Sequence, residues 1–271
     1  MTRLEKSPRS TRVSLCGSVP LWTLVIGGLW SWNEAAAAEP AGVAVVELFT
    51  SEGCSSCPSA DRLLQKIVEA HQKTGSPVYC IGWHVDYWDR LGWPDRLADR
   101  RYTRRQHMYA QKMELRAVYT PQTIVNGTDE FVGSDAKLST QSIANGLRTP
   151  ARHRVQLTVR RGKTADAADI DYSVSPAAPG QLLQLVLVET GLKTDVKAGE
   201  NRGESLVHAN AARAWTTVRL GKENSGTAAL TLPTGAREPA VRVIAFVQSP
   251  ETLFVSGAAD AAWVADSKKS R

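Results

Sequence analysis

The spacing of hydrophobic and polar residues changes several times along the chain, and each change predicts a new element. An apolar, β-branched run at residues 43–50 predicts a buried strand. Residues 57–73 then follow helical spacing, and residues 78–83 form a second run typical of a buried strand. Gly75, Ser76 and Pro77 separate the two. This strand–helix–strand order predicts a crossover that joins two parallel strands.

The following segment, residues 84–117, has no strand character. An aromatic turn opens it, and residues 95–113 predict one or two helices rich in arginine. The arginines recur at helical spacing, which is typical of a solvated face and, in a minority of proteins, of a docking surface for an acidic partner: Arg96, Arg100, Arg101, Arg104 and Arg105.

Pro121 precedes a short β-branched strand, and Asn126-Gly127 predicts a hairpin whose second strand is at 130–132. Residues 137–148 predict a helix that closes this half of the chain.

Beyond Thr149-Pro150 the pattern becomes that of a β protein. Six runs have strand character, at residues 154–160, 169–174, 181–189, 216–220, 227–232 and 241–248. Turn signals separate these runs, which is the pattern of a small antiparallel sandwich. The sequence therefore predicts two domains, an α/β domain over residues 39–149 and a β-rich, sandwich-like domain over 150–265, with a tail at 266–271.

The first 38 residues predict a secretory signal peptide. Four basic residues (Arg3, Lys6, Arg9, Arg12) precede an apolar core at 21–30, and the run of alanines ending at Ala38 offers a cleavage site. We expect a periplasmic or secreted protein, with a retained N-terminal anchor as the alternative. No later segment resembles a membrane span. Without the four basic and two acidic residues of the first 38, the charge of +6 falls to about +4, which gives no reason to expect nucleic acid as a partner.

Two cysteines, Cys54 and Cys57, stand between the first strand and the first helix. A thiolate at a helix N-terminus is stabilised by unpaired N–H groups and the helix dipole, which makes it nucleophilic at neutral pH. The mature chain keeps these two and Cys80, and one pair plus a spare favours a working dithiol over a structural disulfide or a metal clip. A closed zinc site needs four ligands, and no second CxxC is present. Glycine-rich nucleotide fingerprints are also absent, so no cofactor is expected.

Other polar residues have more than one interpretation. Cys80 lies on a predicted buried strand and is most simply a core residue, with a third redox or ligand thiol as the alternative. His84 follows that strand at the sheet edge where the CxxC also lies, so it is a candidate base, proton shuttle or metal ligand, or else part of a loop ordered by aromatic side chains. Between strands of the second half come polar residues that could cap the interface with the first domain or bind a ligand, and the sequence gives no chemistry for choosing: Glu200, Asn201, Arg202, Gly203 and His208.

The first half, with its strand, CxxC, helix and crossover, resembles the thioredoxin superfamily. The resemblance implies that Pro121, preceded by Thr120, is a cis-proline that contacts substrate near the first cysteine. It also implies that Glu47, inside the first strand, is a buried acid that assists proton transfer beneath the CxxC. An outward-facing position of Glu47 on an edge strand is the alternative.

More narrowly, the chain resembles a secreted bacterial family filed as domain of unknown function 1223. The resemblance covers the mature chain and rests on four motifs, which are residues 47–58 (ELFTSEGCSSCP), 84–93 (HVDYWDRLGW), 119–122 (YTPQ) and 199–208 (GENRGESLVH). It implies a thioredoxin-like fold and export, and it supplies no substrate.

The expected function is thiol–disulfide oxidoreduction, in which Cys54 attacks and Cys57 resolves the mixed disulfide. Protein thiols or disulfides are the expected partners, together with a protein that recycles the dithiol. One alternative is soft-metal binding, most plausibly Cu(I), by Cys54, Cys57 and His84. The copper chaperones of this superfamily, however, place three residues between their cysteines. A further alternative is a non-catalytic interaction module, in which the β-rich half performs the function.

Overall fold

The computed structural model describes residues 41–162, 164, 166–231 and 240–263. The expected signal peptide and tail lie outside these residues. The described residues belong to one compact unit. No helix in the described part of the chain is long and apolar enough to cross a membrane.

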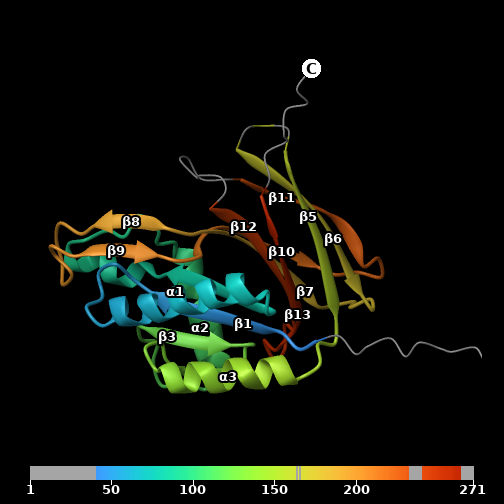
Figure 1. Cartoon of the computed structure of the whole chain (residues 1–271), viewed down its shortest axis with the longest axis horizontal. Coiled ribbons are helices and arrows are strands. Elements are labelled where there is room, and N and C mark those ends of the chain that lie inside the picture. Colours follow the sequence, from blue (N-terminus) through green and yellow to red (C-terminus); the bar gives the residue numbers. More distant parts are fainter. Residues whose placement is uncertain (1–40, 163, 165, 232–239, 264–271) are drawn as a thin grey trace, which may run out of the picture. The chain divides into compact units, whose positions relative to one another are not determined.

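A large mixed sheet of eight strands dominates the fold (Figure 1). Its order is β13 (Val255–Ala262), β12 (Val241–Gln248), β7 (Leu182–Glu189), β10 (Ala211–Arg219), β2 (Val78–His84), β1 (Ala44–Thr50), β3 (Gln122–Val125) and β4 (Asp129–Val132). β1 and β2 are parallel, as the crossover predicts, and β1 pairs antiparallel with β3 on its other side. The CxxC follows the carboxyl end of β1, next to the end of β2.

Two smaller sheets accompany the large one. β11 (Ser225–Thr231), β6 (Ala167–Ser175) and β5 (Arg154–Arg161) form a three-stranded antiparallel sheet. An apolar core joins this sheet to β7 and β12, with Ile170 packed among Leu185 and Val243. The other small sheet is the hairpin of β8 (Leu192–Asp195) and β9 (Ser205–His208).

Four helices flank the large sheet: α1 (Cys57–Thr74), the 3₁₀ helix η1 (Asp86–Leu91), α2 (Arg100–Lys112) and α3 (Ala136–Arg148). α1 buries Ala60, Leu64 and Val68 against the face of β1 that presents Val46 and Leu48. α2 covers the opposite face, where its tyrosines pack with aromatic residues of β1 and β2. Because successive side chains of a strand point to opposite faces, each residue of β1 is committed to one of these two cores.

The two predicted halves share one sheet. β10, from the second half, pairs in parallel with β2 from the first, with Ala211 opposite Gly82. One core then holds Phe49 and Trp83 together with Val186 and Phe246. The cause is visible in β7, whose continuous apolar run is buried along nearly its whole length, so both of its faces need an apolar cover. The three-stranded sheet supplies one cover, and the core beneath α2 supplies the other.

Three strands were not predicted from the sequence. β8 and β9 have only four residues each and contain polar residues, and β13 is rich in alanine and glycine, which have low strand propensity. β13 forms because β12, which pairs with β7 on one side, offers a free edge on the other. β8 and β9 form a hairpin that lies against α1.

Candidate functional site

Cys54 and Cys57 form a disulfide at the N-terminus of α1. Cys57 is the first residue of the helix and Pro58 follows in the first turn, where a missing N–H costs little. The Cys57 N–H donates to the carbonyl of Cys54 at 3.1 Å, which closes the turn between them. Both cysteines are 0% exposed, although the motif lies at a junction of loop and helix. Other segments must therefore cover the disulfide.

The segment around Pro121 lies against one side of the CxxC. The Ser56 hydroxyl donates to the carbonyl of Thr120 at 3.4 Å, and the Thr120 hydroxyl accepts from the indole N–H of Trp88 at 2.8 Å. The Thr120–Pro121 peptide bond is cis, as the resemblance implied. The structure thus brings Thr120 and Pro121 to the cysteines.

A loop from the second half of the chain lies against the other side. We call residues 196–204, between β8 and β9, the capping loop. The side-chain amide of Asn201, which is buried, donates to the carbonyls of Glu52 at 2.8 Å and Cys54 at 2.9 Å. The Glu200 carboxylate accepts from the N–H of Ser55 at 3.0 Å and from its hydroxyl at 2.7 Å. Polar residues for which the sequence left an interface cap and a binding role open are therefore in direct contact with the CxxC.

Beside the disulfide lies a buried cluster of two histidine–carboxylate pairs. His84, the last residue of β2, places Nδ1 2.7 Å from Oδ2 of Asp95. His208, the last residue of β9, places Nε2 3.2 Å from Oε1 of Glu52. The two imidazole rings meet edge to face with centroids 4.7 Å apart.

The same pairs are held in place by the loop that follows β2. The indole N–H of Trp93 donates to Glu52 at 2.8 Å, and the N–H of Glu52 donates to Asp95 at 2.9 Å. The sequence offered two roles for His84, as part of an ordered loop or as a group near the dithiol. The structure places it at the end of β2, where the following loop packs, and in a buried cluster that is joined to the CxxC through Glu52.

The electrostatics of the cluster follow from its burial and its pairing. Burial alone would raise the pKa of Asp95, but the charge and the hydrogen bond of His84 outweigh it and lower the pKa to about 2. Burial alone would lower the pKa of His84, but Asp95, with Asp61 and Glu52 nearby, raises it instead. The His84–Asp95 pair is thereby favoured as an imidazolium and a carboxylate.

Asp61 is the carboxylate nearest to the cysteines along α1. It follows Cys57 by four residues, so the two side chains share one face of the helix with Cβ atoms about 5–6 Å apart. Both residues are buried. Burial raises the pKa of Asp61, and the charges of His208 and His84 act in the opposite direction. Asp61 also lines a cavity of about 200 Å³ between Pro58 and β9, through which the carboxyl group adjoins solvent-accessible space.

The sequence analysis missed Asp61, although a signal was present. The buried face of α1 consists of Cys57, Ala60, Asp61, Leu64 and Val68, so a carboxylate stands in the middle of the apolar stripe. An acid in that position is costly unless it is paired or functional.

A family model described as a protein of unknown function, DUF1223, matches residues 45–248. This chain belongs to the DUF1223 family. The DUF1223 chain is 27% identical to a protein from Agrobacterium tumefaciens solved as a structural genomics target, with a TM-score of 0.60 over 82% of this chain and 95% of that one. HBP35 of Porphyromonas gingivalis has a similar fold, with 16% identity and a TM-score of 0.60 over 83% of this chain and 76% of that one. No functionally curated protein matches the chain.

Glu47 of the DUF1223 chain does not lie beneath the CxxC. It is buried, but it points to the α2 face of β1, opposite α1. Its carboxylate pairs with Arg105, at 2.5 Å from Nε and 2.9 Å from a terminal nitrogen, and accepts from Trp83 and Tyr109. Neither of the positions considered from the sequence, beneath the CxxC or outward on an edge strand, is the one observed. The reason is the alternation of β1, which directs Val46 and Leu48 to α1 and residue 47 to α2.

Arg105 corrects the expectation of a solvated arginine face. The other four arginines of the run are exposed, but Arg105 is buried, and its guanidinium lies 5.1–5.5 Å from the centroids of four aromatic rings. It also donates to Gln248 of β12, which links α2 to the second half of the chain.

The third thiol of the DUF1223 chain, Cys80, is a core residue, as its position on a strand predicted. It is 1% exposed, and burial raises its pKa to about 12. Among the described residues, no group of three or more His, Cys, Asp and Glu side chains is arranged to hold a metal ion. Metal binding by Cys54, Cys57 and His84 remains a prediction from sequence.

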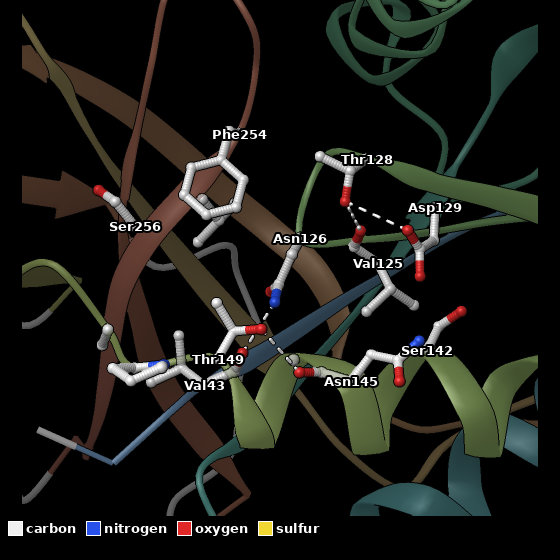
Figure 2. A pocket seen from close by; sticks show the side chains of 14 residues that line it. Val43, Val125, Asn126, Thr128, Asp129, Ser142, Asn145, Thr149, Phe254 and Ser256 are labelled. Atoms are coloured by element: carbon white, nitrogen blue, oxygen red, sulfur yellow. Dashed lines mark hydrogen bonds between the residues drawn. The ribbon is translucent and has the colours of Figure 1, made fainter.

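A separate cavity of about 170 Å³ lies at the other end of β1, near Val43 (Figure 2). Figure 2 shows the Asn126 side chain pointing into this region from the β3–β4 hairpin. Its amide oxygen accepts from the N–H of Val45, and its amide nitrogen donates to the carbonyl of Val43. Asn126 therefore extends the pairing of β1, which assigns this region a structural role.

Proposed function

We propose that this DUF1223 protein is an exported, thioredoxin-like thiol–disulfide oxidoreductase that acts through Cys54 and Cys57. One observation carries the proposal: the CxxC disulfide lies at the N-terminus of α1, on the same buried helix face as Asp61. A purely structural disulfide has no use for a neighbouring buried carboxylate of raised pKa, whereas thiol exchange requires a proton acceptor. The first half, with a parallel crossover and Pro121 next to the CxxC, supports a thioredoxin-like assignment, and β5–β7 with β10–β12 support a sandwich-like second half.

In the reducing direction, the thiolate of Cys54 attacks one sulfur of a substrate disulfide. A bond forms between Cys54 Sγ and that sulfur, and the other substrate sulfur leaves as a thiolate that takes up a proton. The thiol of Cys57 then loses its proton to Asp61, directly or through one water, and attacks Cys54 Sγ. The Cys54–Cys57 disulfide forms, the second substrate thiol is released, and two electrons have passed to the substrate. The reverse sequence oxidises a substrate dithiol.

The helix N-terminus makes the attacking thiolate available for the first step. The N–H groups of the first turn of α1 are unpaired within the helix and, with the helix dipole, stabilise negative charge on Cys54. The sequence between the cysteines, Ser55-Ser56, adds no histidine, so an extreme oxidant is not expected. Export to a compartment where disulfides persist, following removal of the signal peptide, agrees with this chemistry.

The deciding experiment is the equilibrium of the purified mature protein with glutathione, read by thiol trapping and mass spectrometry. We expect a reversible two-electron couple with a potential above about −250 mV, within the range of catalytic dithiols. Cys80→Ala serves as the control, because its buried thiol takes no part in the couple. Cys57→Ser is expected to accumulate a mixed disulfide on Cys54.

A disulfide that stays intact below about −300 mV is structural, and that result would overturn the proposal. The non-catalytic interaction module would then become the leading interpretation.

A further inference from the structure

The capping loop lies against one side of the buried CxxC, and few hydrogen bonds hold it there. Asn201 and Glu200 make all four of the hydrogen bonds described between the loop and residues 52–55. The remaining backbone bonds of the loop are internal: Gly203 N–H donates to Val196 at 2.9 Å, and Val196 N–H donates to Glu204 at 2.9 Å. The loop is therefore a self-contained unit that rests on the CxxC.

The way in which the loop is attached allows it to move alone. Its flanking strands, β8 and β9, pair only with each other and do not belong to the eight-stranded sheet. The strands of the hairpin are held by α1, by Arg96 and by the His208–Glu52 pair. The loop at its tip has only the few hydrogen bonds given above, and such segments open locally at far lower free energy than a sheet core. Displacement of the tip of the hairpin breaks no strand pair of the large sheet.

The groups that the loop uses are those that an incoming peptide would need. The N–H and hydroxyl of Ser55 bind the Glu200 carboxylate, and the carbonyls of Glu52 and Cys54 bind the Asn201 amide. All of these groups border the disulfide, and they are satisfied by the loop only while it is closed. A substrate that reaches Cys54 must displace the loop and satisfy the same groups.

We propose that the capping loop is a lid that occupies the substrate-docking surface of the CxxC, and that the substrate which displaces it is a protein segment carrying a carboxylate next to its cysteine. The carboxylate takes the place of Glu200 on Ser55. The lid slows the attack of small thiols on the disulfide without changing the equilibrium that they reach, and it admits more readily a partner able to compete for its hydrogen bonds. The assignment of a substrate rests on the proposed oxidoreductase function, but the existence of the lid does not.

The lid is tested by the rate at which a phosphine reduces the Cys54–Cys57 disulfide in the folded protein, followed by alkylation and mass spectrometry. Asn201→Ala removes the buried anchor and is expected to increase the rate about tenfold or more, and Glu200→Gln, which changes only an exposed contact, several-fold. Glu204→Gln is the matched control, because Glu204 lies in the same loop, is exposed, and contributes only backbone bonds.

Equal rates within about twofold for wild type, Asn201→Ala and Glu200→Gln would overturn the lid, as would a control variant that is reduced as fast as Asn201→Ala. Because the phosphine reduces structural and catalytic disulfides alike, this result is independent of the proposed function. Glu200→Gln is a surface change and keeps the test valid if Asn201→Ala does not fold.

The substrate class is tested with two short peptides, activated as mixed disulfides with thionitrobenzoate, that differ only in Glu or Gln beside the cysteine. We expect the reduced protein to react several-fold faster with the Glu peptide, and Ser55→Ala to diminish that preference by removing the hydroxyl donor. Equal rates for the two peptides in the wild-type protein would overturn the acidic-substrate assignment. If the reduced protein reacts with neither peptide and the Cys54–Cys57 disulfide has a reduction potential below about −300 mV, the proposed function is overturned instead.

Discussion

Asp61 follows Cys57 by one turn of α1, and both side chains are buried on the same face of the helix. Burial opposes the ionisation of both groups. A buried carboxyl group resists ionisation, and a buried thiol must lose a proton before it can attack. Transfer of the proton from the Cys57 thiol to the Asp61 carboxylate produces a neutral buried acid and a reactive thiolate.

Asp61→Asn is accordingly expected to slow the closure of the Cys54–Cys57 disulfide from a Cys54 mixed disulfide. A positioned acid or base typically contributes 10²–10⁴-fold, so we expect a loss of at least about tenfold at neutral pH, and a flatter pH profile than that of the wild type. The measurement is a quenched single-turnover reaction. Glu69→Gln, an exposed acid on the same helix, is the control, and equal closure rates for both variants would remove Asp61 from the mechanism.

The same substitution is expected to stabilise the protein. Burial raises the pKa of Asp61, so ionisation is harder in the folded than in the unfolded state. The wild type therefore loses stability as pH rises through that raised pKa, and the neutral Asn does not. Denaturant unfolding should show Asp61→Asn to be the more stable protein at pH 8, with the difference shrinking toward pH 4. If Asp61→Asn is less stable than the wild type at pH 8, the Asp61 carboxylate is stabilised by its neighbours in the folded protein, and the prediction is wrong.

Glu47 is predicted to matter for stability and not for exchange. Glu47→Gln leaves Arg105 buried without its charge partner, and breaking a buried pair in this way costs about 3–5 kcal/mol. The reduction potential and closure rate of the folded fraction should stay at wild-type values, because Glu47 lies on the far face of β1. The double variant Glu47→Leu/Arg105→Met removes both charges and should lose less stability than the single variant. If the Cys54–Cys57 disulfide closes more slowly in Glu47→Gln than in the wild type, Glu47 takes part in thiol exchange and this prediction is wrong.

These positions show how far the sequence determines the site. The CxxC and its helix follow from local patterns, whereas the place of Pro121 beside them follows only from the resemblance to the thioredoxin superfamily. The position of Glu47 was predicted wrongly, because the sequence shows that a carboxylate lies inside a strand but not which face of the sheet it occupies. For the capping loop and His208 the sequence offered an interface cap or a binding role without a choice between them. Their contact with the CxxC could not be predicted, because they lie about 150 residues from it and nothing local in 199–208 encodes that contact. Of the residues that the sequence analysis missed, only Asp61 could have been predicted, because it is a charged residue within the apolar stripe of a helix.

The His84–Asp95 pair predicts stability that depends on pH at both ends. Asp95 has a pKa lowered to about 2, so its contribution is present above the ordinary value near 4 and is lost as pH falls toward 2. His84 has a raised pKa, so its contribution is present below about 6.5 and is lost as pH rises through the raised value. Asp95→Asn should cost about 3–5 kcal/mol at pH 6 and remove both transitions.

The control for this pair is Asp171→Asn, which disrupts an exposed pair with Arg160 and should cost less than about 1 kcal/mol at any pH. Unfolding by denaturant from pH 3 to pH 9 distinguishes the two. If Asp95→Asn behaves like the control, the buried pair does not carry the charges that we assign to it.

The shared sheet makes a final prediction about the boundary near Thr149-Pro150. Residues 39–150 alone would expose the β2 edge that Ala211 covers, and the aromatic core that contains Phe49 and Trp83 would lose Val186 and Phe246. Arg105 and Tyr109 would also lose Gln248. We expect this fragment to show no cooperative unfolding transition by circular dichroism and to aggregate, because its large apolar face has no cover. Co-expression with residues 151–271 should restore a soluble complex. A fragment that unfolds cooperatively on its own would establish the first half as an independent domain despite the shared sheet.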